Sequence, residues 1–307
     1  MGNATQKVWD RLDEEARVLV ASQAAEWQCD PAALLAVIEV ESAGRIFARV
    51  DGRNEPLIRF EGHWFDRLLS GAARGRARRM GLAHPSAGRV ANPRSQAARW
   101  KLLRRAIAVD RQAALSSCSW GLGQVMGFHW RRLGFGSTDA LVAEARRGAA
   151  GQIALMTRFI EMEGLVPALR ARDWQRFARR YNGPAYRRLG YHTKLASAYA
   201  RASRLALDAA PALPEPASHG GLAFGARGER VRRLQRALTR EGHQLVADGL
   251  FGIRTDRALR AWQGARGAAA TGAVSLGDAW HLFGARAVLA IVMARARRLL
   301  PSRRAAA

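Results

Sequence analysis

The sequence has little cysteine and no recognisable set of metal ligands. Only two cysteines, Cys29 and Cys118, occur in 307 residues, which is too few for a disulfide framework. Neither lies in the local motif of a catalytic cysteine, and the His-Glu-x-x-His pattern of zinc peptidases is absent. These absences argue against a zinc peptidase, a zinc amidase and a cysteine peptidase. We therefore expect no metal and no cofactor.

Long apolar runs are also missing. The first residues lack the apolar segment of a secretory signal peptide, and Gln6 stands where a myristoylation motif needs Ser or Thr. The apolar part of segment 286–307 is shorter than the roughly 20 residues that cross a bilayer. We expect a protein that is made in the cytoplasm without a signal peptide.

Lysine is scarce, yet the chain is strongly basic. Lysine occurs only as Lys7, Lys101 and Lys194, while the formal net charge is +25 because arginine is abundant. A field of this sign attracts nucleic acid, anionic lipid or lipopolysaccharide, and the bacterial cell wall, although a GC-rich genome would give the same composition. The arginines are scattered and no nucleic-acid-binding module is recognisable, so we expect no specific nucleic acid partner.

A proline- and glycine-rich segment, residues 209–221, divides the chain and favours an extended linker. We predict a large domain over residues 1–208, a small domain over 222–285 and a basic amphipathic tail over 286–307. The tail pattern suits binding to anionic lipid or lipopolysaccharide, and equally suits a capping helix with a solvated face.

The fold class expected from periodicity is mainly α with a minor strand element. Apolar residues recur at helical spacing over residues 8–27, 97–109, 140–163 and 174–180. The candidate strand is the short segment 56–61. Beyond the linker, the pattern predicts three short helices over 229–241, 255–266 and 275–283.

One predicted helix places a glutamate among apolar side chains. Asp30 followed by Pro31 is a helix start signal, and Gly44 suits the end. At about 100° per residue, Glu41 falls on one stripe with apolar neighbours, whereas Glu39 points away from it. The apolar members of that stripe are Leu34, Val37 and Ile38.

A carboxyl group held against apolar side chains loses solvation of its charged form, which raises its pKa. Cleavage of a glycosidic bond needs such a group to protonate the leaving oxygen. The alternative is a structural ion pair between Glu41 and Arg45 or another arginine, and periodicity alone favours that alternative.

Four ordered motifs resemble a known family. They are residues 36–44, which contain Glu41 and Ser42; residues 51–65; residues 119–126; and Tyr181-Asn182 with the following Gly-Pro. Together, over roughly residues 25–205, they resemble the N-acetylmuramidase family of phage endolysins in the lysozyme-like superfamily. The resemblance implies a lysozyme-like α+β domain that cleaves the β-1,4 bond between N-acetylmuramic acid and N-acetylglucosamine in peptidoglycan.

The same resemblance implies Glu41 as the catalytic acid and Glu61 as the second carboxylate. Residues 48–50 lengthen the loop before Asp51 relative to the family, so Glu55 and Asp51 remain alternatives to Glu61. A carboxyl separation of about 5 to 5.5 Å would imply a retaining route, and about 6.5 to 9.5 Å an inverting one. A lytic transglycosylase, which relies on one glutamate and gives anhydro products, is the nearest other enzyme.

The resemblance also implies substrate-binding residues. In the segment 119–126, glycines allow close backbone approach and Gln124 has an amide that suits a sugar N-acetyl group, although a tight packing turn is the alternative. The expected substrate-binding residues are Ser42, His63, Ser119, Gly121, Gln124, Met126, Tyr181 and Asn182.

Residues 227–272 resemble a peptidoglycan-binding type 1 domain, a small three-helix module. Its second Asp-Gly repeat is reduced here to Thr271-Gly272. The motif residues are Leu234, Gln235, Asp248, Gly249, Phe251, Gly252, Thr255, Trp262 and Gln263. We expect a monomeric endolysin whose partner is peptidoglycan and which reaches the wall, in the periplasm, after holin-dependent release. A non-enzymatic peptidoglycan-binding protein is the alternative from another class.

Overall fold

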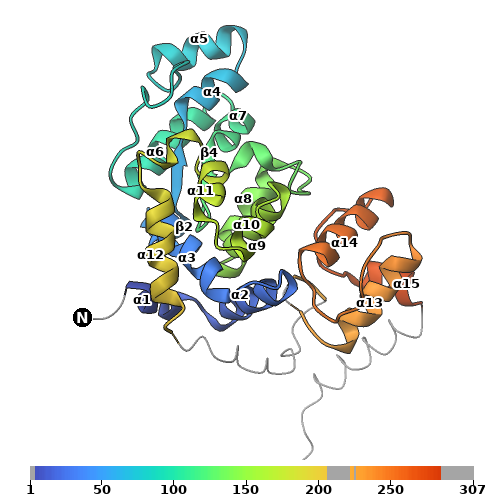
Figure 1. The fold of residues 1–307 in the computed structure, drawn as a ribbon. Helices are drawn as coiled ribbons and strands as arrows, with labels where there is room; N and C mark the ends of the chain where they lie inside the picture. The colour runs from blue at the N-terminus through green and yellow to red at the C-terminus, as the bar shows by residue number, and fades with distance from the viewer. Residues whose placement is uncertain (1–3, 206–221, 225, 285–307) are drawn as a thin grey trace, which may run out of the picture. The chain divides into compact units, whose positions relative to one another are not determined.

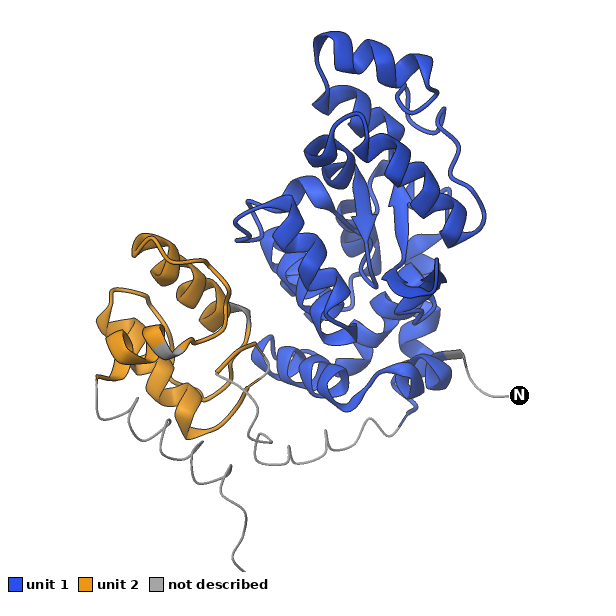
Figure 2. Cartoon of the chain, turned by 180° about the vertical axis from the view of Figure 1, so that it is seen from behind, with its two compact units in different colours: residues 1–214 blue, residues 215–307 orange. Residues whose placement is uncertain are grey.

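The computed structural model describes all residues except 1–3, 206–221, 225 and 285–307. The chain divides into two compact units, residues 1–214 and 215–307 (Figure 2). The predicted linker 209–221 and the predicted tail 286–307 lie outside the described residues. Both units are mainly helical, which confirms the predicted fold class.

Unit 1 is built around one central helix, α3 (Pro31–Ser42), which packs against α1 (Ala4–Arg11), α2 (Glu14–Glu26) and α12 (Tyr191–Ala202) (Figure 1). The remaining helices of unit 1 are α4 (Gly62–Leu68), α5 (Gly71–Arg79), α6 (Gln96–Ile107), α7 (Arg111–Ser116), α8 (Thr138–Arg146), α9 (Ala149–Met162), α10 (Val166–Arg170) and α11 (Trp174–Tyr181), with short 3-10 turns η1 (Gly127–His129) and η2 (Pro184–Tyr186).

Two predicted helices of unit 1 are each broken in two. The segment 8–27 is interrupted at Asp13, whose carboxylate caps α2 by accepting from the Ala16 N–H at 2.9 Å. The segment 140–163 is interrupted at Gly148, whose φ of 146° is open only to glycine. The apolar periodicity continues across both breaks because the two halves share a packing surface: α1 and α2 both pack against α3, and α8 packs against α9.

The strands of unit 1 form two small antiparallel sheets. The strand β1 (Phe47–Val50) pairs with β2 (Arg53–Pro56) across a turn at Asp51 and Gly52, both of which have positive φ. The order of the second sheet is β3 (Ile58–Phe60), β4 (Cys118–Trp120) and β5 (Val125–Met126). The segment 56–61 does contain the predicted strand, but the other four strands, β1, β2, β4 and β5, were not predicted.

The second sheet is anchored in an apolar core and positions residues of the site directly after its strands. Phe60 pairs in register with Cys118, and Ile58 with Trp120. All four side chains are buried, and the Trp120 ring packs edge to face on Trp100 of α6. Each fully buried large apolar side chain contributes about 1.5–3 kcal/mol. The core therefore fixes the two residues that follow the strands, Glu61 after β3 and Gly121 after β4.

Unit 2 consists of α13 (Glu229–Arg240), α14 (Ile253–Ala265) and α15 (Leu276–Phe283), as predicted. Its core is formed by Val231, Leu234, Leu238, Phe251, Leu259 and Trp262, with further side chains around them. The turn between α13 and α14 is held by Gln235, whose amide donates to Asp248 at 2.7 Å and accepts from the Gly249 N–H at 2.9 Å.

The turn between α14 and α15 repeats this arrangement with other partners. The Gln263 amide accepts from the Gly272 N–H at 3.0 Å, and donates to the Thr271 hydroxyl at 3.2 Å and to Asp278 at 2.9 Å. A buried glutamine thus clamps each of the two turns.

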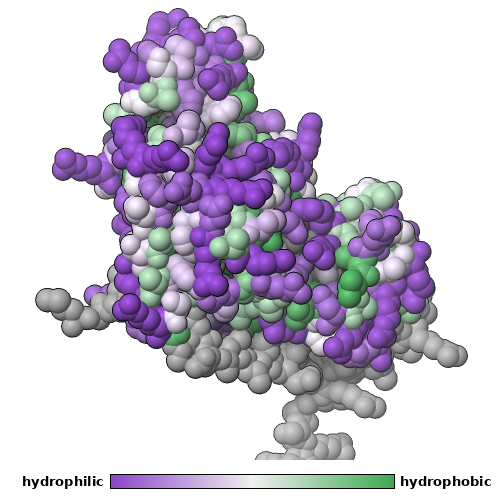
Figure 3. Space-filling view, in the orientation of Figure 1, coloured by the Kyte–Doolittle hydropathy of each residue, from purple (hydrophilic) through white to green (hydrophobic). Residues whose placement is uncertain are grey.

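Hydrophilic side chains predominate on the face shown in Figure 3. Among the described residues, the large apolar side chains that are exposed to solvent are Leu68, Met80, Leu189, Val246 and Trp280. In the part of the chain that the structure describes, no helix has both the length and the apolar character needed to cross a membrane.

Candidate active site

The helix that carries Glu41 begins and ends as its sequence predicts. The Asp30 carboxylate accepts from the Ala32 N–H at 2.9 Å, and Pro31 occupies the first turn. At the other end Ala43, with φ 52°, takes the left-handed position one residue before Gly44. Every residue from Ala32 to Ile38 is buried, so the helix has no single apolar stripe but is enclosed on all sides.

Glu41 lies at the last turn of this enclosed helix and is partly buried. Its Oε1 accepts a hydrogen bond from the Asn182 Nδ2 at 2.7 Å. Burial raises the pKa of the Glu41 carboxyl from 4.5 to about 7, although the hydrogen bond from Asn182 acts in the opposite direction. The protonated and the ionised form of the carboxyl are therefore both populated near pH 7.

The ion-pair alternative for Glu41 has no support within the described residues, where neither Arg45 nor another arginine pairs with this carboxylate. Glu39 has that role instead: its carboxylate accepts from the Thr5 hydroxyl and from the Arg201 guanidinium. Glu41 and Glu39 thus have different partners on different sides of α3, as the helical phasing predicts.

Tyr181 and Asn182 stand at the end of α11, and both reach the site. The Tyr181 hydroxyl donates to the Gly123 carbonyl at 2.7 Å, and its ring stacks on Phe177. Burial, together with the charge of Glu41, raises the pKa of the Tyr181 hydroxyl well above 10, so the hydroxyl stays a donor. The Oδ1 of Asn182 is buried and has no hydrogen-bond partner among the described residues.

The segment between β4 and β5 is a tight turn whose polar groups largely satisfy one another. Gly121 and Gln124 both have positive φ, 66° and 47°. The Ser119 hydroxyl donates to the Gln124 Oε1 at 2.9 Å, and the Gln124 Nε2 donates to the Gly121 carbonyl at 2.8 Å. The side chain of Gln124 is thus engaged within the turn, which matches the alternative of a packing turn, and its contact with a sugar stays a prediction.

Close packing explains the glycines of this turn. A side-chain carbon on Gly121 would lie 2.7 Å from Gln152, and one on Gly123 would lie 2.6 Å from Met156 and 3.0 Å from the Tyr181 hydroxyl. The main chain therefore passes directly over α9, and the turn presents its backbone to the same region as Tyr181.

Glu61 directly follows β3 and precedes α4. Its backbone N–H donates to the Ser117 carbonyl at 2.9 Å, and its carboxylate accepts from the Arg59 Nε at 2.7 Å. The His63 Nδ1 lies 3.5 Å from the Glu61 Oε2, at the limit of a hydrogen bond. This separation is a close approach and not a hydrogen bond, since the buried His63 Nδ1 has no hydrogen-bond partner among the described residues.

The two rival carboxylates are engaged elsewhere. Glu55 forms a two-pronged ion pair with Arg146, at 2.7 and 3.0 Å. Asp51 lies in the β1–β2 turn with its side chain 70% exposed and pairs with Arg104 at 2.9 Å.

Tyr191, which sequence reasoning missed, connects the surroundings of Glu41 and Glu61. Burial and the charge of Glu41 raise the pKa of the Tyr191 hydroxyl, while the Arg59 guanidinium lowers it. Arg59 is the residue that pairs with Glu61. One tyrosine is thus within electrostatic range of Glu41 and of the cation that holds Glu61, and the choice of Glu61 over its rivals stays a prediction. No motif marks Tyr191, since it comes from the start of α12.

The other predicted residues of the site have more local roles. The Ser42 hydroxyl is buried and donates to the Ile38 carbonyl at 2.9 Å, whereas Met126 is partly exposed on β5. Within the described ranges no group of three or more His, Cys, Asp or Glu side chains is arranged to hold a metal ion.

Most motif residues of unit 2 are interior. Leu234, Gln235, Phe251, Thr255, Trp262 and Gln263 are each at most 4% exposed, and Gly249 and Gly272 carry the clamped turns. These residues hold the module together, and which side chains contact the wall stays a prediction.

A helix that is buried from Ala32 to Ile38 and carries a protonatable glutamate in its last turn suits a lysozyme-like enzyme that cleaves glycan. Residues 30–203, more than half of the chain, match the family model described as N-acetylmuramidase, and the chain belongs to this family. Residues 227–276 match the model described as putative peptidoglycan binding domain. Both predicted resemblances are confirmed.

Among solved structures, the crystal structure of the Burkholderia AP3 phage endolysin is similar to this chain. The two share 34% identity with a TM-score of 0.54, over 62% of this chain and 71% of that one. A search of curated proteins gave no match.

Proposed function

We propose that this chain is an endolysin-type muramidase that hydrolyses the β-1,4 bond between N-acetylmuramic acid and N-acetylglucosamine, with Glu41 as the general acid. Peptidoglycan hydrolysis follows from the family, from the wall-binding module and from the similar phage endolysin. The observation that carries the residue assignment is the carboxyl of Glu41, whose pKa is raised to about 7 and which Asn182 holds in place.

The protonated Glu41 gives its proton to the glycosidic oxygen as the bond to the anomeric carbon breaks. The Asn182 Nδ2 holds the carboxyl in one orientation and stabilises the carboxylate that remains. The Oδ1 of Asn182 is a buried acceptor that the described residues do not use.

Glu61 is proposed as the second carboxylate. Its ion pair with Arg59 fixes the side chain while leaving it 21% exposed, so a water molecule or a sugar can approach it. As a base it would activate water, and as a nucleophile it would form a covalent intermediate. The anomeric configuration of the first product, followed by NMR, distinguishes inversion from retention.

The test is digestion of purified peptidoglycan with mass spectrometry of the products. Reducing N-acetylmuramic acid ends are expected, whereas anhydro ends would show a transglycosylase and no products would leave only a binder. Glu41→Gln and Glu61→Gln should abolish or strongly reduce product formation. Glu55→Gln is the matched control: because Glu55 is committed to Arg146, it should retain activity.

Unit 2 is proposed to hold the enzyme on its insoluble substrate, since tethering raises the local concentration of glycan at the active site. Deletion of residues 222–307 should leave cleavage of soluble glycan fragments intact and weaken action on intact sacculi. Equal losses on both substrates would reject this role.

The site of action proposed is the cell wall, reached after holin-dependent release during phage lysis. Binding of the tail 286–307 to anionic lipid or lipopolysaccharide is a separate proposal that rests on its sequence. Truncation after Ala285 should then reduce killing of unpermeabilised cells, and unchanged killing would reject it.

A further inference from the structure

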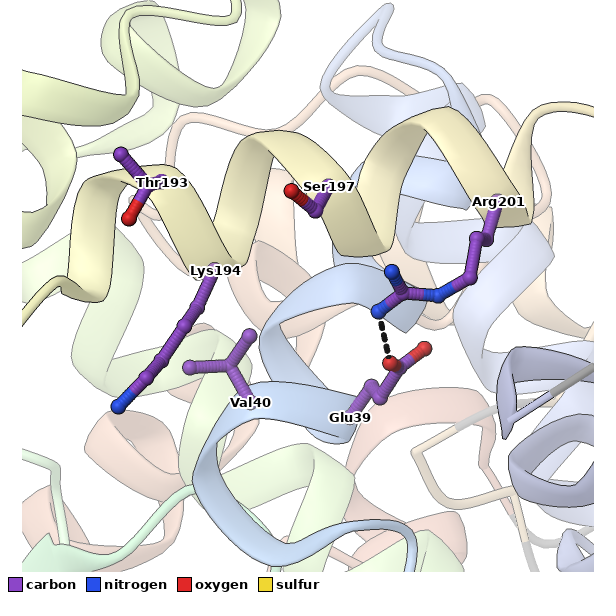
Figure 4. A pocket seen from close by; sticks show the side chains of 6 residues that line it. All are labelled: Glu39, Val40, Thr193, Lys194, Ser197 and Arg201. Carbon is purple, nitrogen blue, oxygen red and sulfur yellow. Dashed lines mark hydrogen bonds and ion pairs between the residues drawn. The ribbon is translucent and has the colours of Figure 1, made fainter.

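Helix α1 is tied to the last turn of α3, which is the turn that carries Glu41. The Thr5 hydroxyl belongs to a fully buried residue of α1 and donates to the Glu39 carboxylate. The Arg201 guanidinium of α12 pairs with the same carboxylate, as the dashed line in Figure 4 shows, and also donates to the Thr5 hydroxyl at 3.3 Å. One carboxylate thus joins α1, α3 and α12.

Two further contacts of α1 fix the residues at which α3 ends. The Arg11 guanidinium donates to the Ala43 carbonyl at 2.9 Å, and the buried Val8 packs on Gly44. A side-chain carbon on Gly44 would lie 2.9 Å from both methyl groups of Val8, so α1 and the end of α3 are in close contact. The contacts of α1 therefore fall on both sides of Glu41 in the sequence.

The side of α3 that Glu39 occupies is opposite to that of Glu41. Side chains two positions apart in a helix point about 200° apart, and Asn182 contacts Glu41 on its own side. A hollow of about 490 Å³ opens beside Glu39 and Val40 (Figure 4), and both residues are partly exposed. On this side the turn is therefore held by the polar contacts of Glu39 more than by tight packing.

The position of this turn matters for the chemistry of Glu41. Glu39 and Glu41 share one helical turn, so a shift of the backbone at one of them moves the other. A displacement of about 1 Å in a reacting group can cost roughly a hundredfold in rate. Helix α1 precedes the residues 30–203 that match the family, so membership of the family assigns no role to it.

We propose that α1 braces the catalytic helix, and that Thr5, acting through Glu39, is a positioning residue for Glu41. The inference rests on the proposed function, in which Glu41 is the general acid. Without the Thr5 hydroxyl, the Glu39 carboxylate loses a partner, the last turn of α3 loosens, and water gains access to Glu41. The carboxyl then loses part of the burial that raises its pKa to about 7.

The experiment uses the full chain with solubilised glycan as the substrate. Thr5→Val removes the hydroxyl and nearly keeps the volume of the buried side chain, and Thr5→Ser keeps the hydroxyl. Arg11→Met removes the contact with Ala43 at an exposed position. Lys7→Met, at another exposed position of α1, is the matched control. For each variant kcat, KM, the pH–rate profile and Tm are measured.

Thr5→Val should lower kcat roughly threefold to tenfold with KM nearly unchanged, and should move the alkaline limb of the pH–rate profile to lower pH. Arg11→Met should act in the same direction, and Thr5→Ser should restore most of both effects. The titratable groups near Glu41 are the hydroxyls of Tyr181 and Tyr191, whose pKa values burial raises. Both stay protonated near pH 7, so the limb reports on Glu41.

A lower Tm with an unchanged kcat and an unchanged limb would show that α1 only stabilises the fold, and would overturn the inference. Equal effects of Lys7→Met would do the same. If Thr5→Val does not fold, the same two readouts on Arg11→Met decide. These results leave the muramidase assignment standing, whereas failure of the wild type to cleave glycan, or full activity of Glu41→Gln, would instead overturn the proposed function.

Discussion

The raised pKa of Glu41 has a consequence for stability. A carboxyl group whose pKa is 4.5 in the unfolded chain and about 7 in the folded one binds more protons when folded. Its contribution to stability is complete below pH 4.5 and is lost as the pH rises through 7. The difference of about 2.5 pH units, at about 1.4 kcal/mol each, corresponds to roughly 3 kcal/mol.

Glu41→Gln removes this ionisation with little change of shape. The amide is neutral at every pH, and its oxygen still accepts from the Asn182 Nδ2, which donates to Glu41 Oε1 in the wild type. Compared with the wild type, the variant should therefore gain roughly 3 kcal/mol at pH 9 and little at pH 4. For a unit of about 200 residues this is a rise in Tm of about 6–12 °C at pH 9.

Differential scanning calorimetry of both proteins from pH 4 to pH 9 measures the effect. Glu14→Gln, at an exposed position in the first turn of α2, is the control and should show no gain that grows with pH. If the difference between Glu41→Gln and the wild type were the same at pH 4 and pH 9, the assigned burial of the carboxyl would be wrong. Any loss of activity in Glu41→Gln would then need another explanation than the loss of a protonated acid.

Three further predictions follow from single contacts. The rate of glycan hydrolysis should fall as the pH rises through about 7, because the general acid Glu41 loses its proton there; a pH–rate profile flat to pH 9 would contradict this. Asn182→Ala removes a hydrogen bond that lowers the pKa of Glu41. The alkaline limb of the pH–rate profile should therefore move to higher pH while kcat drops, and a shift of that limb to lower pH would count against the assignment. Gly272→Ala should destabilise unit 2 by about 1–3 kcal/mol from its positive φ, and by more because the added carbon would clash with the buried Asp256 carboxylate. Gly267→Ala, with the same sign of φ and open space around it, isolates the backbone cost in urea melts.

The sequence predicts the parts of the site that lie within one local motif. Asp30 and Pro31 start a helix for reasons that act over a few residues, and helical phasing then separates Glu41 from Glu39 without any tertiary information. The Asn182 contact with Glu41 spans 141 positions, and only the resemblance to a family brought those two residues together.

The residues that sequence reasoning missed come from segments without a motif. Arg59 reads as an exposed strand residue, and Tyr191 reads as the start of an ordinary amphipathic helix. The position of Tyr191 near Glu41 depends on α12 lying against α3 (Figure 1), which no periodicity reveals. The strand β4 was missed because all three of its residues are buried and show no alternation, whereas the predicted strand β3 alternates buried, exposed and buried.

In unit 2 the second turn lacks the Asp of the Asp-Gly motif, and another carboxylate takes its place in the structure. The first turn uses Asp248 as the partner of Gln235, and the second has Thr271 at the corresponding place. Gln263 nevertheless keeps the glycine N–H of its turn, and finds the missing carboxylate in Asp278 at the start of α15. Because a buried glutamine with both amide groups satisfied is what stabilises each turn, the altered repeat retains its clamp. The second turn is therefore expected to stay folded despite its altered motif. We expect any difference in wall binding to come from exposed side chains around the turn and not from the buried Gln263.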